Sequence, residues 1–143
     1  MTTFLLDVNV LIALIDPAHV QHDKSRAWFY RIGKQNFATC PMTENGLIRT
    51  VGLPKYPNSP GPPSSVAKLL TAFRGMPGHQ FWPDNIRIAV DPFIDLGLLS
   101  NHGRVTDSYL LALAPARGGR LATMDHRLAP DAVSDGAASL ELI

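Results

Sequence analysis

The sequence predicts an α/β protein with a central parallel sheet of about five strands. Short apolar segments with strand character alternate with amphipathic segments of helical spacing, the order that parallel strands joined by helices require. The length of 143 residues and the hydrophobic content of 45% suit one domain with a substantial core. Acidic residues also stand at the ends of predicted strands, and this edge of a parallel sheet is where sites form.

The predicted strands are short apolar runs bounded by turn or helix signals. The first, FLL, is apolar throughout, as expected for a strand buried on both faces. The strands are expected at residues 4–6, 36–39, 79–82, 120–123 and 139–142. With a strand order of 3-2-1-4-5, the ends of the first and fourth strands would meet at the point where the order reverses.

The predicted helices occupy the segments between the strands. They are expected at 8–15, 22–33, 43–51, 65–74, about 92–98 and 106–116. Asp16-Pro17 ends the first helix because proline disfavours helix in the residue before it. Thr106 is expected to cap the last helix. The segment 53–65, LPKYPNSPGPPSS, is too rich in proline for a helix interior or a central strand and is predicted to be a surface loop.

Composition and charge exclude several classes of protein. A net charge of +1 does not by itself indicate a nucleic-acid binder. The single cysteine, Cys40, excludes an internal disulfide and suits a reducing compartment. No Lys or Arg precedes the apolar N-terminal run, which Asp7 and Asn9 interrupt and which is too short to span a bilayer. We therefore expect a cytoplasmic protein without a membrane anchor.

Four acidic residues stand at strand ends or helix starts. They are Asp7, Glu44, Asp107 and Asp125. Each could simply cap a helix or interact with its dipole, a contribution of roughly 0.3–1 kcal/mol. Asp7 is the hardest to explain in this way, because its neighbours are apolar and an uncharged Ser or Asn would cap without the cost of burying a charge. In the expected strand order, Asp7 and Asp125 would face each other across a crevice.

A cluster of carboxylates requires compensation, because two unit charges ~4 Å apart repel by about 4 kcal/mol at an effective dielectric constant near 20. Oxygen ligands of this kind select Mg²⁺ or Mn²⁺. Cys40 and the five histidines lack the spacing of a zinc site. Carboxylate-bound Mg²⁺ commonly acts on phosphates. Without the four acids, eight acidic residues remain against 13 basic ones. This excess of positive charge fits a surface that approaches a polyanion, and it fits equally well the charge that keeps an ordinary protein soluble.

At these residues the chain resembles the PIN-domain ribonucleases, and among them the VapC toxins of type II toxin–antitoxin systems. The resemblance runs in family order over nearly the whole chain. The matching stretches are LLDVNVLIALID at 5–16, ATCPMTENGLIRTVGLP at 38–54, GHQFWPDNI at 78–86, VTDSYLLALA at 105–114 and GGRLATMDHRL at 118–128. The proline-rich loop at 53–63 is less standard in the wider family.

The resemblance implies a three-layer α/β/α fold, with residues 1–143 as a single PIN domain. It implies a Mg²⁺- or Mn²⁺-dependent endoribonuclease whose metal ligands and catalytic acids fall on Asp7, Glu44, Asp107 and Asp125. It also implies a homodimer and a VapB-like antitoxin that blocks the site, often through a basic side chain. RNA is the expected substrate.

Further residues have weaker assignments. Asn9 and Thr123 are candidates to orient a carboxylate or a bound water, and the alternative for Asn9 is a local backbone hydrogen bond. Arg49 could contact a phosphate or form a structural ion pair. His102 and Arg104 could contact RNA or the antitoxin, or lie in a solvated loop.

Two other functions remain open at this point. A haloacid-dehalogenase-like phosphatase also carries an acid after its first strand, but it requires a second acid where this chain has Asn9. It also requires a later lysine, and every lysine here precedes Asp107. The other alternative is a non-catalytic PIN-fold module that binds RNA.

Overall fold

The computed structural model describes all 143 residues and contains one parallel sheet. Its strands are β1 (Phe4–Leu6), β2 (Phe37–Thr39), β3 (His79–Phe81), β4 (Arg120–Thr123) and β5 (Leu140–Leu142). They lie in the order β3-β2-β1-β4-β5, and every neighbouring pair is parallel. This confirms the predicted fold class and the number of strands, and the order is the one in which the ends of β1 and β4 meet.

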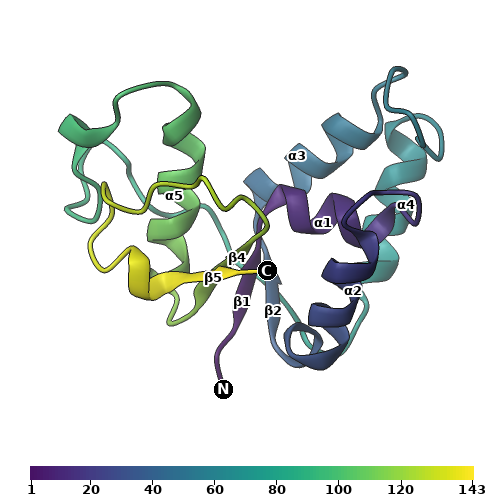
Figure 1. The fold of residues 1–143 in the computed structure, drawn as a ribbon, viewed down its shortest axis with the longest axis horizontal. Coiled ribbons are helices and arrows are strands. Elements are labelled where there is room, and N and C mark those ends of the chain that lie inside the picture. Colours follow the sequence, from purple (N-terminus) through teal and green to yellow (C-terminus); the bar gives the residue numbers. More distant parts are fainter.

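Helices cover both faces of the sheet and form the three expected layers (Figure 1). The helices are α1 (Val8–Ile15), α2 (His22–Arg31), α3 (Pro41–Val51), α4 (Pro63–Arg74) and α5 (Gly103–Ala116). The first four pack on one face, and α5 packs on the other. Successive strand residues point to opposite faces, so Leu6 contributes to the core beneath α1–α4 and Leu5 to the core beneath α5.

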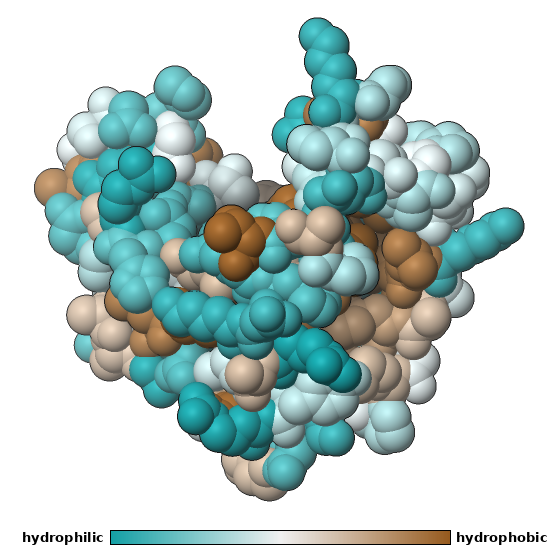
Figure 2. Space-filling model, turned by 45° about the vertical axis from the view of Figure 1, so that its right-hand side comes forward, coloured by the Kyte–Doolittle hydropathy of each residue, from teal (hydrophilic) through white to brown (hydrophobic).

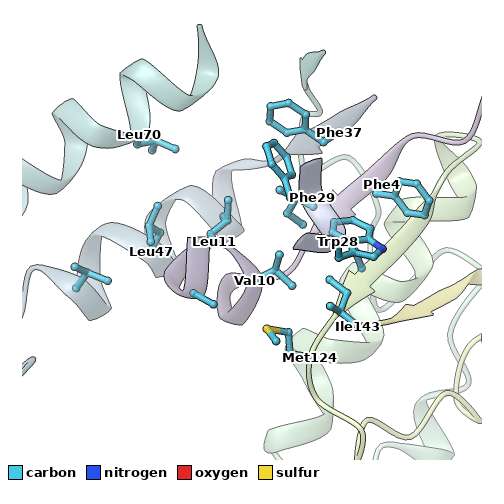
Figure 3. Packing of buried hydrophobic residues seen from close by; sticks show 14 of the residues in the cluster. Phe4, Val10, Leu11, Trp28, Phe29, Phe37, Leu47, Leu70, Met124 and Ile143 are labelled. Carbon is cyan, nitrogen blue, oxygen red and sulfur yellow. The ribbon is translucent and has the colours of Figure 1, made fainter. Parts of the chain in front are cut away.

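Aromatic residues fill much of the core on the face covered by α1–α4 (Figure 3). Phe29 of α2 meets Phe37 of β2 edge to face, with ring centroids 5.1 Å apart. Trp28 meets Phe4 of β1 in the same manner at 5.2 Å. Both Trp28 and Phe29 are buried. These contacts hold α2 against the sheet and fix the strands whose ends carry the acids.

Several helix boundaries differ from the predicted ones. Helices α3 and α4 begin two residues earlier than expected, because Pro41 and Pro63 occupy first helical positions, where a missing N–H costs nothing. Helix α5 begins at Gly103, so Thr106 lies inside the helix and the predicted cap is wrong. The helix expected at about 92–98 is also wrong: the Asp95 carboxylate accepts from the Gly97 N–H at 3.0 Å, and only a short 3₁₀ turn, Leu96–Leu98, forms.

The proline-rich loop between α3 and α4 is tied to the end of α1. The Tyr56 hydroxyl donates to the buried carboxylate of Asp16 at 2.5 Å, and Asp16 also accepts from the Ala18 N–H at 3.0 Å. The loop is therefore held at one point although it contains no helix or strand. No helix in the structure has the length and apolar character needed to cross a membrane.

Candidate active site

Asp7 lies where β1 ends and α1 begins. One carboxylate oxygen accepts from the Val8 N–H at 2.7 Å and so caps α1. The other accepts from the Thr123 hydroxyl at the end of β4, at 2.8 Å. The residue is only 7% exposed. Asp7 therefore caps α1, and its hydrogen bond from Thr123 bridges the point at which the strand order reverses.

Asn9 and Thr123 join the ends of β1 and β4. The Asn9 amide nitrogen donates to the Thr123 hydroxyl at 3.0 Å and lies 3.5 Å from the Asp7 carboxylate, while its oxygen accepts from the Met124 N–H at 3.1 Å. The Thr123 hydroxyl also accepts from the Asp125 N–H at 3.1 Å. Thr123 therefore holds the Asp7 carboxylate and the backbone at Asp125, and Asn9 ties Thr123 to the next residue of the chain, Met124. That either residue orients a metal-bound group stays a prediction.

Asp107 and Asp125 approach Asp7 from α5 and from the end of β4. Burial raises the pKa of the Asp107 carboxyl to about 6, and the charges of Asp7 and Asp125 add to this effect. Burial also raises the pKa of Asp7, with a smaller contribution from Asp125, against the lowering effect of the hydrogen bonds from Thr123 and Val8. Three acids from distant parts of the chain therefore repel one another at one edge of the sheet.

Little positive charge compensates these three acids. Neither Asp7 nor Asp107 forms an ion pair with any side chain of the protein. Asp125 has only Arg127, at 3.8 Å, whose side chain is 97% exposed. Such a set of oxygen donors fits a divalent cation. The side chains are not drawn together tightly enough to form a ligand set as they stand, so they would have to converge on the ion.

Glu44 has different partners. Its carboxylate accepts from the Thr39 hydroxyl at 2.6 Å and pairs with Arg74 of α4 at 3.4 Å. Burial and the charge of Arg74 lower the pKa of the nearby His79, and Glu44 partly opposes them. Glu44 is absent from the charges that raise the pKa of Asp107. Electrostatic interactions thus couple three of the four predicted acids, and the ligand roles of all four stay predictions.

The three predicted contact residues have unlike environments. Arg49 is exposed and forms no ion pair with the protein, so it is free to meet a ligand. His102 is exposed at the start of α5. Arg104 pairs with Asp131 and donates to the Leu98 carbonyl, so it braces two loops. An outside contact through Arg104 would therefore compete with these internal bonds.

Thr39, Arg74 and His79 are polar neighbours of the site that sequence reasoning missed. Thr39 is the last residue of β2, at the same sheet edge as Asp7, and its position alone could have identified it. Arg74 and His79 come from α4 and β3, and nothing in their local sequence indicates that they meet Glu44. Figure 2 shows this edge as a notch between the half of the molecule that contains α5 and the half that contains α3 and α4.

Comparison with known proteins gives the family. No family model matches the chain. Ribonuclease VapC39 of Mycobacterium tuberculosis is 42% identical over 130 residues, which cover 91% of this chain and 94% of that protein. Ribonuclease VapC44 of the same organism is 42% identical over 132 residues, or 90% of each chain. Ribonuclease VapC38 is 39% identical over 121 residues, or 85% of this chain and 84% of that protein.

These identities extend over most of both chains and are accompanied by the expected parallel sheet with helices on both faces. They agree with the family that the motifs around the four acids indicate. The chain therefore belongs to the VapC toxins, which are PIN-domain ribonucleases.

Proposed function

We propose that this protein is an endoribonuclease toxin that uses Mg²⁺ or Mn²⁺ to hydrolyse RNA phosphodiester bonds. The observation that supports this most strongly is the group of three acids, Asp7, Asp107 and Asp125. Beyond the effect of burial, the charge of Asp125 raises the pKa of both Asp7 and Asp107, and the charge of Asp7 adds to the rise at Asp107. Neither Asp7 nor Asp107 has an ion-pair partner in the protein. A buried unpaired charge is costly, so a fold that retains such a group is expected to bind a cation there.

The three aspartates would hold the cation, and Glu44 would join them only if its ion pair with Arg74 opened. A bound divalent ion would supply an activated water and would offset the charge of the phosphodiester. The protein's own part is to hold the acids in place. The Thr123 hydroxyl and the Val8 N–H fix both oxygens of Asp7, so its carboxylate has little freedom to rotate.

The cellular role follows from the family. A VapB-like antitoxin would neutralise the enzyme, and the uncompensated acids suit a basic side chain of such a partner. We propose a homodimer in the cytoplasm, on family grounds for the dimer and because one unpaired cysteine suits a reducing compartment. Arg49 and His102 are exposed and would be available to RNA or to the antitoxin.

The test uses antitoxin-free protein and total RNA, with Mg²⁺ or Mn²⁺ and then with EDTA. We expect metal-dependent cleavage at discrete sites, lost in Asp7→Asn and retained in Asp23→Asn, which changes an exposed acid of α2 in the same way. RNA binding without cleavage would instead indicate a non-catalytic module. Release of phosphate from a monoester with intact RNA would contradict the proposal, although Asn9 already stands where such a phosphatase needs an acid.

A further inference from the structure

A second surface feature lies between β3 and the C-terminal end of α4, beside Glu44. It is a hollow of about 330 Å³ whose lining contains a cation, an imidazole and an exposed aromatic ring but no carboxylate. The lining residues are Thr71, Arg74, Gly75, His79 and Phe81. Apart from the ion pair of Arg74 with Glu44, the cleavage chemistry proposed above leaves these residues without a role.

Arg74 and Phe81 form the centre of this hollow. The guanidinium lies over the Phe81 ring, 5.1 Å from its centroid, and its ion pair with Glu44 holds it on one side. The Arg74 side chain is still 43% exposed, and Phe81 is 45% exposed. Phe81 belongs to neither core cluster. The two side chains are thus fixed relative to each other while both remain accessible.

The hollow extends along β3, and its Phe81 end lies at the same edge of the sheet as the three aspartates. Phe81 is the last residue of β3, and Asp7 directly follows the last residue of β1. β2 separates these strands, so the chain positions are about 10 Å apart at the usual strand spacing. Thr39, at the end of β2, contacts both Glu44 and His79. A single-stranded polymer that reaches the aspartates can therefore also reach the hollow.

We propose that this hollow binds one unpaired nucleotide of the RNA substrate next to the scissile bond. The base stacks on the exposed part of the Phe81 ring, and the Arg74 guanidinium contacts the adjacent phosphate. Aromatic rings and arginine planes are the groups on which proteins stack unpaired RNA bases, and arginine binds phosphate well. This assignment rests on the proposed ribonuclease function and adds to it a determinant of substrate binding.

The charge of the hollow favours RNA over a protein segment as its occupant. Its lining contains Arg74 and no acid. Arg74 pairs with Glu44 on one side, and the exposed part of its guanidinium can still donate to an anionic phosphate. A segment of an antitoxin that neutralises acids through basic side chains would be repelled here. Binding of a basic antitoxin segment in this hollow would overturn the proposal.

The test compares Phe81→Leu with Phe81→Tyr, each in the Asp7→Asn background so that RNA is not cut. Phe93→Leu is the matched control, because Phe93 is a similarly exposed phenylalanine, at 41%, and lies outside the hollow. The probe is a fluorescent single-stranded RNA of mixed sequence, together with the same backbone lacking bases. We expect Phe81→Leu to weaken binding of the base-containing RNA about 5- to 30-fold, and Phe81→Tyr to restore it.

The base-free RNA separates stacking from charge. Phe81→Leu should leave its affinity unchanged, and Arg74→Ala should weaken both RNAs. The proposal would be overturned if Phe81→Leu and the control Phe93→Leu bound the base-containing RNA with equal affinity. It would also be overturned if Phe81→Leu weakened binding of the antitoxin but not of the RNA. In the Asp7 wild-type background, Phe81→Leu should raise KM with little change in kcat. If RNA stayed intact in the cleavage assay with Asp7 present, the proposed catalysis would be contradicted. The binding measurements in the Asp7→Asn background would still test whether the hollow binds a nucleotide.

Discussion

Replacing Asp107 by Asn is expected to stabilise the metal-free protein at neutral pH while abolishing its activity. The reason is that the ionised Asp107 is repelled by Asp7 and Asp125 and is partly buried. These effects raise its pKa from the ordinary value of 3.8 to about 6, and no protein hydrogen bond contributes to the shift. Asn keeps the size of the side chain but removes its charge.

The size of the effect can be worked from that pKa. At about 1.4 kcal/mol per pKa unit, the rise corresponds to at most about 3 kcal/mol against folding when Asp107 is ionised. The side chain is only half-buried and solvent screens part of the repulsion, so we expect a gain of about 1 to 1.5 kcal/mol in the variant. The pKa of Asp107 is higher in the folded protein than in the unfolded chain. The free energy of unfolding of the wild type therefore falls by this amount as pH rises from 3.8 through about 6.

The assay is urea unfolding of both proteins in EDTA, at about pH 7.5 and again near pH 4, where the gain should vanish. Asp23→Asn, which changes an exposed acid, controls for the loss of one negative charge. Added Mg²⁺ should stabilise the wild type and reverse the order of stability. If Asp107→Asn were less stable than Asp23→Asn in EDTA at neutral pH, the reasoning about mutual repulsion would be refuted.

The remaining predictions concern two hydrogen bonds. Thr123→Val should destabilise the protein by about 1–3 kcal/mol in urea unfolding, because it leaves the buried Asp7 carboxylate without its hydroxyl donor. The same variant should cleave RNA more slowly. Unchanged stability would show that Asp7 is not held by this bond. Tyr56→Phe should cost about 1–2 kcal/mol through loss of the bond to Asp16. The Tyr56 pKa is raised from 10.0 to about 12, so the stabilisation from this bond should be lost in the wild type, and only there, as pH rises from 10.0 through about 12. Circular dichroism would follow the unfolding of both proteins over this range. Parallel curves of stability against pH for the wild type and Tyr56→Phe would rule the bond out.

The strands and the acids at their ends could be predicted from the sequence because their signals are local, whereas the strand order depends on how distant segments pair. β1 is a short apolar run, and parallel strands place their carboxyl ends at one edge. Asp7 was identifiable because a charge inside an apolar run needs an explanation. Asp125 and Asp107 then followed from their places after a strand and near the start of a helix.

The surroundings of Glu44 could not be predicted, since they depend on contacts between distant segments. Glu44 and Arg74 are 30 residues apart, and their pairing depends on how α3 and α4 pack. The exposure of Phe81 likewise follows from its place at the end of an edge strand, whereas its sequence neighbours suggest burial. The missing helix near residue 95 shows a local competition, in which a side-chain bond replaced the helical turn.

The central claim is that Asp7, Asp107 and Asp125 together bind one divalent cation. Calorimetric titration of Mn²⁺ into the antitoxin-free protein tests it without reference to RNA. The account predicts one site in the wild type and in Asp23→Asn, weakened at least about tenfold in each of the three single Asp→Asn variants. Glu44→Gln measures separately whether that residue joins the site. Manganese affinity that is unchanged in all three aspartate variants would contradict the account.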